Sequence, residues 1–384
     1  MSGIDLGRIL LWAYVVAFGG YCLIVLVGAL LRPRPGRVVG AGEPLSLGIV
    51  VPAFNERRHE GHIRATIAAA RELDVPIVVV DDGSTDGSTE VLEHLCGEAG
   101  ARLLKQVPNQ GKSAALNAGI AALGTALVLT VDADTTLETA GVREAAAAFA
   151  DPAVGAVALT VDGTGASRVA RAQVVEYRYL LNFEREALGR FGVVFTVPGS
   201  ASLWRRTALE QIGGFTTRTC AEDTDATICL SLAGWKIEIA PDVRAITECP
   251  LTVGALIRQR SRWIWGTIQA AAFAMIQIVR ERPSRQAWPA MVFVAVTALN
   301  IFGFLLSLAI LWRWVGGALG WSEICAAGLL FVTGFLRLAL AYWKERHTGG
   351  NIFKILLRLA GVQLANTLAF WHGLATGRAF RVSW

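Results

Sequence analysis

The sequence predicts an α/β protein in which helices cover both faces of a mostly parallel sheet, joined to α-helical transmembrane segments. Short, fully apolar strands alternate with amphipathic helices between residues 45 and 134, a pattern typical of parallel strands buried on both faces. Polar clusters follow these strands at their carboxyl ends. Longer apolar segments, each long enough to cross a bilayer, lie on both sides of this domain.

The composition agrees with this division into a globular part and a membrane part. The mean hydropathy of +0.47 is too high for a purely soluble chain of 384 residues, and 17% charged residues is too many for a purely membrane one. The net charge of +5 is modest and does not suggest a nucleic-acid partner. The six cysteines form no CxxC pair, so we interpret them as reduced thiols and not as disulfides or a zinc site.

The first apolar segment, Ile9–Leu31, is nearly free of charge. It is too long for the core of a signal peptide, and no clear small-residue cleavage site follows, so we expect an uncleaved anchor. Arg32, Arg34 and Arg37 come directly after it. The positive-inside rule therefore places the N-terminus outside and the next domain, about residues 45–250, in the cytoplasm.

Four predicted strands each run into a polar cluster. The strands are Leu47–Val51, Ile77–Val80, Arg102–Gln106 and Ala126–Val131, and the clusters are, in order, 52–56, 81–86, 109–112 and 132–134. In a parallel sheet the ligand lies beyond the carboxyl ends of the strands. Because all four clusters fall at that edge, the sequence predicts a nucleotide-type site there.

The usual glycine-rich phosphate-binding motifs are missing from this edge. No GxGxxG follows the first strand, and the chain contains no GxxxxGK[ST]. Asp132 and Asp134 end the fourth strand at alternate positions, and two such carboxylates can bind a hard cation, Mg²⁺ or Mn²⁺, that neutralises a diphosphate. Aspartate is also common in the turn after a strand, and the spacing alone leaves both interpretations open.

A second acidic cluster opens a predicted helix that extends through Leu232. It contains Glu222, Asp223 and Asp225. Acidic side chains in the first turn are favoured by the helix macrodipole, which is one explanation of the cluster. The other is that one of these carboxylates acts as a general base.

The stretch 258–263 gathers three arginines, a glutamine and a tryptophan. On a helix Gln259 and Arg262 share a face because they are three residues apart. Arginine's planar fork suits phosphate oxygens, and the ring of Trp263 offers a surface on which a sugar can stack. A basic interfacial helix on anionic lipid, anchored by Trp263 and Trp265, fits the same residues.

Three further apolar segments complete the chain, at roughly Ala287–Leu311, Ile324–Trp343 and Ile355–Leu374. Arg337 lies within one of them, and such a residue usually faces a protein interior or a water-filled path. The basic link Lys344–Asn351 should be cytoplasmic. The predicted organisation is a transmembrane helix at 9–31, a cytoplasmic domain at 45–250, interfacial helices at 251–282 and three transmembrane helices within 287–374, in a multi-pass protein of the plasma membrane.

Taken in order, these motifs resemble the membrane-integrated, processive family 2 glycosyltransferases, which include cellulose, hyaluronan, chitin-oligosaccharide and poly-N-acetylglucosamine synthases. The motifs are Val51–Glu56, Asp81–Ser84, Asp132–Asp134, Glu222–Asp223 and Gln259–Trp263. The last has the QxxRW form of the polymerising members. Residues 222–225 and 247–250 look most like the poly-β-1,6-N-acetylglucosamine synthases. The resemblance implies a GT-A type fold for the domain.

The resemblance implies a UDP-sugar donor, a divalent metal ion (Mg²⁺ or Mn²⁺), inversion at the anomeric carbon and a growing polysaccharide as acceptor. Lys112 would approach the diphosphate, and Asp132 and Asp134 would position the donor and the metal. The residues expected around the uracil and ribose are Pro52, Ala53, Asn55, Glu56, Asp81 and Asp82.

The same resemblance implies how the acceptor reacts. Asp223 would deprotonate the acceptor hydroxyl, which attacks the anomeric carbon. Gln259 and Arg262 would hold the departing diphosphate, and Trp263 would stack on the acceptor sugar. The other residues expected beside the acceptor are Gly199, Ser200 and Glu222.

The chain departs from the family patterns in three places. Ala221 stands where many members have threonine, and the loop Thr196–Pro198 lacks the aromatic-cysteine pattern of several synthases. One span precedes the domain, whereas the poly-N-acetylglucosamine type usually has two.

We expect a processive inverting transferase that makes a β-linked polysaccharide from UDP-N-acetylglucosamine and passes it across the lipid bilayer, with a small membrane subunit as a candidate partner. The alternatives are a non-processive enzyme that loads one sugar onto a lipid carrier, and a non-enzymatic membrane scaffold.

Overall fold

The structure, a computed structural model, describes residues 6–31, 45–281, 285–317, 320–344 and 351–377. Arg32, Arg34 and Arg37, which set the predicted orientation, lie outside these ranges, as does most of the basic link before Asn351. The orientation in the membrane therefore stays a prediction.

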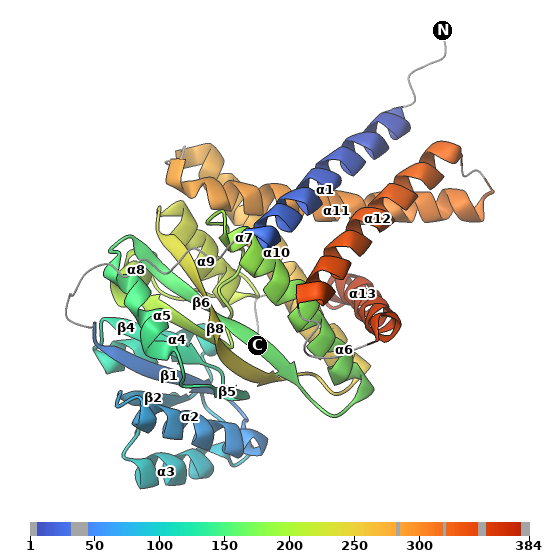
Figure 1. Cartoon of the computed structure of the whole chain (residues 1–384). Coiled ribbons are helices and arrows are strands. Elements are labelled where there is room, and N and C mark those ends of the chain that lie inside the picture. Colours follow the sequence, from blue (N-terminus) through green and yellow to red (C-terminus); the bar gives the residue numbers. More distant parts are fainter. Residues whose placement is uncertain (1–5, 32–44, 282–284, 318–319, 345–350, 378–384) are drawn as a thin grey trace.

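One mixed sheet of eight strands forms the centre of the domain, in the order β3-β2-β1-β4-β7-β6-β8-β5 (Figure 1). The strands are β1 (Leu47–Ala53), β2 (Ile77–Asp81), β3 (Arg102–Lys105), β4 (Leu127–Val131), β5 (Thr135–Leu137), β6 (Val154–Thr164), β7 (Ala201–Arg205) and β8 (Lys236–Glu248). β1 pairs in parallel with β2 and β4, and β2 with β3. β7 is antiparallel to both of its neighbours. The predicted α/β fold with a mostly parallel sheet is confirmed.

Helices cover both faces of this sheet. They are α2 (Glu60–Glu72), α3 (Ser88–Ala99) and α5 (Val142–Ala147) on one face, and α4 (Lys112–Leu123), α8 (Arg206–Gln211) and α9 (Glu222–Leu232) on the other. Successive strand residues point to opposite faces. Ile49 and Val51 therefore belong to one core and Val50 to the other, and all three are fully buried. This explains why β1 reads as an unbroken apolar run.

The last strand, β8, brings distant segments to the site. It runs parallel to β6 and antiparallel to the short strand β5. Its side chains are only partly buried and many are polar, so it lacks the apolar run that marks the first strands. The pairing Thr135↔Thr247 places the end of β8 beside the segment that follows Asp134.

A helical insertion joins the sheet to the membrane part. It consists of α6 (Arg168–Glu176), a π-helical turn (Tyr177–Asn182) and α7 (Phe183–Gly189). After β8, the stretch 258–263 lies within one continuous helix of 29 residues, α10 (Val253–Glu281).

Within the described ranges, four helices are long and apolar enough to cross a membrane. They are α1 (Leu6–Leu30), α11 (Trp288–Val315), α12 (Trp321–Lys344) and α13 (Ile352–Ala375). Figure 1 shows them gathered on one side of the molecule, away from α2 and α3. Arg337 of α12 donates to Glu184 of α7 at 3.2 Å, and Tyr21 of α1 bonds to the same carboxylate. The arginine within the apolar segment thus faces the protein.

Candidate active site

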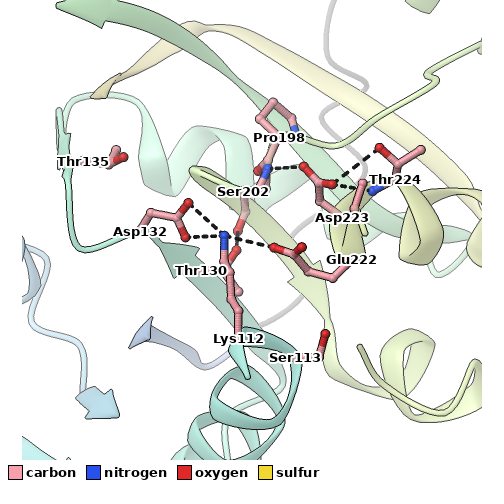
Figure 2. A network of polar contacts seen from close by, with 12 residues as sticks. Lys112, Ser113, Thr130, Asp132, Thr135, Pro198, Ser202, Glu222, Asp223 and Thr224 are labelled. Atoms are coloured by element: carbon pink, nitrogen blue, oxygen red, sulfur yellow. Dashed lines mark hydrogen bonds and ion pairs between the residues drawn. The ribbon is translucent and has the colours of Figure 1, made fainter. Parts of the chain in front are cut away.

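The ammonium of Lys112 lies between two carboxylates at the carboxyl edge of the sheet. Its Nζ is 2.7 Å from Asp132 Oδ1 and 3.0 Å from Glu222 Oε1 (Figure 2). Lys112 begins α4, Asp132 follows β4 and Glu222 begins α9. The fold therefore gathers three predicted site residues that come from distant parts of the sequence.

The charges in this cluster depend on one another. Burial works against the charge of Lys112, but Asp132 and Glu222 raise its pKa, so that it stays protonated. Burial raises the pKa of Asp132 to about 7, although Lys112 opposes the shift. Burial would also raise the pKa of Glu222, yet Lys112 and Arg262 hold it below its ordinary value. The cluster thus has one firmly ionised carboxylate and one that titrates near neutrality.

Asp223, the predicted base, is held at both oxygens by backbone groups. The N–H of Gly199 donates to Oδ2 at 2.9 Å, and the N–H of Thr224 donates to Oδ1 at 2.7 Å. A Cβ at Gly199 would stand only 2.9 Å from Oδ2, so this approach requires glycine. Burial and the nearby Glu222 raise the pKa of Asp223, which makes it a better proton acceptor.

The loop that contains Gly199 and Ser200 connects the two acidic residues. Its glycine N–H binds Asp223, and the carbonyl of Ser200 accepts the N–H of Asp132 at 2.9 Å. Gly199 and Ser200, two of the four predicted acceptor residues, therefore lie beside Asp223 and Asp132.

Asp81 and Asp82 support the site from inside the fold. Asp82 accepts hydrogen bonds from the N–H groups of Gln110 at 2.8 Å and Gly111 at 2.7 Å, one on each oxygen. Asp81 accepts from the N–H of Ser84 at 3.1 Å. Both aspartates are buried, with exposed fractions of 2% and 1%. Asp82 thereby fixes the loop that places Lys112, a role that its position after a strand did not indicate.

The predicted nucleotide loop after β1 is held in an unusual backbone conformation. Asn55 has a φ of +58°, and its Oδ1 accepts the N–H of Thr85 at 2.8 Å, which ties this loop to the end of β2. The carboxylate of Glu56 contacts Nδ1 of His59. The Nε2 of the same imidazole is 3.3 Å from Glu248 at the end of β8. Pro52 and Ala53 are buried within β1.

The two aspartates that were predicted to hold a metal face different neighbours. Asp132 faces Lys112, whereas Asp134 Oδ1 accepts from Thr135 at 3.1 Å and from Thr247 at 3.3 Å. Across the described ranges, no group of three or more His, Cys, Asp or Glu side chains could hold a metal ion. Carboxylate oxygens suit Mg²⁺ or Mn²⁺, so the pair fits such an ion as a partial ligand set that needs further oxygens from elsewhere.

A cavity of about 390 Å³ opens beside Lys112 and Glu222, with Arg262 of α10 on its wall. The first turn of α4 also lines it, so that the partial positive charge of a helix N-terminus faces the space. Asn109, Gln110 and Gly111 of the predicted cluster 109–112 also line this space. The lining residues that the sequence did not reveal are Ser113, Thr217, Thr219 and Cys220, and 217–220 carries no motif.

Gln259 and Trp263 have surroundings that differ from those of Arg262. The Oε1 of Gln259 is buried and, among the described residues, has no hydrogen-bond partner. Trp263 packs edge-on against Tyr177, with ring centroids 6.5 Å apart.

Comparison with known proteins agrees with this geometry. Residues 48–213 match the family described as "Glycosyl transferase family 2". An N-acetylglucosaminyltransferase of Rhizobium meliloti is 31% identical over 301 residues, which cover 73% of this chain and 68% of that protein. For an N-acetylglucosaminyltransferase of Sinorhizobium fredii, the values are 31% identity over 254 residues, 62% of this chain and 61% of the relative.

More distant relatives extend the comparison. A poly-beta-1,6-N-acetyl-D-glucosamine synthase of Staphylococcus epidermidis is 24% identical over 285 residues, 67% of each chain. A mannosyltransferase of Pyrobaculum calidifontis, solved in complex with GDP-Man and Mn²⁺, superposes with a TM-score of 0.68 at 21% identity, over 95% of this chain and 99% of that one. The matched segments span about three-fifths to two-thirds of the first two relatives. The chain belongs to glycosyl transferase family 2, with a GT-A type domain and, among the residues that the structure describes, four candidate transmembrane helices.

Proposed function

We propose that this enzyme transfers N-acetylglucosamine from UDP-N-acetylglucosamine to a growing β-linked polysaccharide, with inversion and without releasing the chain between steps. The observation that carries the proposal is the cavity in which Lys112, Glu222 and Arg262 meet next to Asp132 and Asp223. The names of the relatives support N-acetylglucosamine as the transferred sugar. The QxxRW stretch supports polymerisation.

The cavity suits the diphosphate of such a donor. Lys112, Arg262 and the N-terminus of α4 supply positive charge around it, and each of these groups favours phosphate oxygens. Asp132 and Asp134 would hold Mg²⁺ or Mn²⁺, which would neutralise diphosphate charge when bound. Mn²⁺ is the ion in the mannosyltransferase of similar fold. Uracil and ribose would lie toward the loop of Asn55.

Asp223 is the group that would accept the proton. As the acceptor oxygen attacks the anomeric carbon, its proton passes to a carboxylate oxygen of Asp223 while the bond to the diphosphate breaks. The N–H groups of Gly199 and Thr224 fix the direction of that carboxylate. Negative charge grows on the leaving diphosphate, where Lys112 and Arg262 stabilise it, and such electrostatic terms are commonly the largest in catalysis.

We also propose that the domain faces the cytoplasm of a cell whose plasma membrane the four helices cross. Helix α10 packs against α11 and α13, so the site lies close to the membrane part. A polysaccharide could then be extended and exported along one path, with a small membrane subunit as a candidate partner.

The test uses the full chain in lipid nanodiscs with UDP-N-acetylglucosamine and Mn²⁺. We expect UDP release and products of many sugars. Asp223→Asn should reduce transfer by about 10²–10⁴-fold because the base is lost. Asp74→Asn is the matched control, since Asp74 is exposed and asparagine tolerates its φ of +51°. Full activity of Asp223→Asn would disprove the role of Asp223 as the base. A product that consists of a lipid carrying one sugar would disprove polymerisation.

A further inference from the structure

The QxxRW stretch of α10 and the tryptophan that follows it point their side chains to three different places. Arg262 lines the cavity beside Glu222. Trp265 donates to the carbonyl of Phe370 on α13 at 3.2 Å. Arg260, a residue to which the resemblance gives no role, turns toward α6 and is almost completely buried.

Arg260 forms a buried ion pair with Glu176, the last residue of α6. Its Nη2 donates to Glu176 Oε2 at 2.6 Å, and each side chain is only 4% exposed. Burial raises the pKa of Glu176, although Arg260 and a hydrogen bond from the Asn366 side chain of α13 oppose the shift. Burying two charges is costly, and apolar side chains of similar volume often serve stability as well. The pair therefore calls for an explanation other than stability.

The guanidinium of Arg260 also lies over the ring of Trp263. Its Cζ is 4.2 Å from the ring centroid, which is a cation–π contact. Tyr177 meets the same indole edge-on, at 85° between the ring planes. Because Tyr177 directly follows Glu176, one short segment contacts the indole itself through Tyr177 and binds the guanidinium that lies over it through Glu176.

Glu176 is the only ion-pair partner that the described residues offer Arg260. The Nε of Arg260 is buried without a hydrogen-bond partner there. Loss of the carboxylate would thus free the guanidinium to leave the indole. Helix α13, a candidate transmembrane helix that carries Asn366, packs against α6 and so extends the same arrangement toward the membrane part.

We propose that Glu176 is a positioning residue that, through Arg260, holds the Trp263 indole in the orientation needed by an acceptor sugar, and that Asn366 makes this orientation depend on α13. The part that concerns the acceptor rests on the proposed function. The part that concerns the orientation of the indole does not.

Tryptophan fluorescence tests the orientation without any sugar. The emission of Trp263 is obtained as the difference between each full-length protein and the same protein with Trp263→Phe. In Arg260→Lys the charge stays but the planar group over the ring is lost. We expect acrylamide quenching of Trp263 to rise about twofold as the ring gains rotamer freedom. Glu176→Gln should give a similar rise and Asn366→Leu a smaller one.

Kinetics then test the role in transfer. Arg260→Lys should raise the KM for an acceptor oligosaccharide about tenfold and leave the KM for UDP-N-acetylglucosamine unchanged, because one cation–π contact that orients the acceptor surface is lost. Arg64→Lys, which alters an exposed ion pair on α2, is the matched control. A general loss of structure would instead change both constants.

Unchanged Trp263 quenching in Arg260→Lys would overturn the proposal even if transfer were impaired. Equal changes in both KM values would overturn its acceptor part. If Glu176→Gln does not fold, Arg260→Lys still decides, since it keeps the ion pair. A wild-type enzyme that uses no UDP-sugar would refute the proposed function alone, because the fluorescence result is independent of the donor.

Discussion

The two halves of the catalytic domain are built differently. In the first half, β1, β2 and β4 are buried on both faces, and polar clusters follow directly at their ends. In the second half, β7 is antiparallel and β8 is only partly buried. The candidate active site lies where they meet, since Lys112 comes from the first half and Glu222 from the second. The edge proposed to bind the nucleotide is thus built from regular units, whereas the side proposed to bind the acceptor depends on irregular contacts.

The largest expected effect concerns the second half. Arg260→Met should lower the free energy of unfolding by about 3–5 kcal/mol, because Glu176 would be left as an unpaired buried charge. The double variant with Glu176→Leu should recover most of that loss. Denaturation of the detergent-solubilised proteins measures the free energy of unfolding of the single and the double variant. If the single variant is as stable as the wild type, the second half is not held by this pair.

The next effect concerns the junction between the halves. Lys112→Met should reduce the rate of transfer by about 10²–10³-fold, as expected when one preorganised charge is removed from the site of a developing anion. The melting temperature should fall less than in Arg260→Met, since Lys112 and its two carboxylate partners border a cavity and are more exposed than Arg260 and Glu176. Turnover at saturating donor and thermal unfolding would separate these outcomes. A folded, fully active variant would contradict the role of the lysine.

A smaller effect is expected from the loop between the acidic residues. Gly199→Ala should slow transfer about tenfold, because its Cβ would press on Asp223 and displace the carboxylate from its N–H donor. Gly124→Asn, in the αL conformation with open space around it, is a tolerated control. Activity equal to that of the wild type would show that the position of Asp223 is set elsewhere.

The smallest effect concerns His59, which links Glu56 of the first half to Glu248 of the second. The hydrogen bond that His59 donates to the carboxylate of Glu56 is the main reason why the pKa of His59 is raised. A raised folded-state pKa gives stability that is complete below the unfolded value of about 6.5 and is lost as pH rises through the folded value. One group changes the free energy of unfolding by at most about 1.4 kcal/mol per pH unit. His59→Gln should flatten the dependence of melting temperature on pH above about 6.5, and an unaltered pH profile would argue against the link.

Much of the first half could be predicted because its signals are local. An apolar run followed by Asp81 or Asp132 marks a buried strand and its end, and both features are set by neighbouring residues. Asp82 shows the limit of this reasoning. The resemblance places it beside the donor, and only the structure reveals that both of its oxygens accept backbone N–H groups about thirty residues further along the chain. The cavity residues Thr217, Thr219 and Cys220 had no signal at all, since they occupy a loop without a motif.

The sequence by itself determined the class of fold, the apolar helices and the order of the acidic and QxxRW motifs, because each is encoded within a few adjacent residues. Only the tertiary structure decided that Lys112 pairs with Glu222, that Thr247 bonds to Asp134, and that Arg260 turns away from the cavity toward Glu176. These pairings join segments that are far apart in the chain. They depend on strand order and helix packing, which no local pattern of residue types contains.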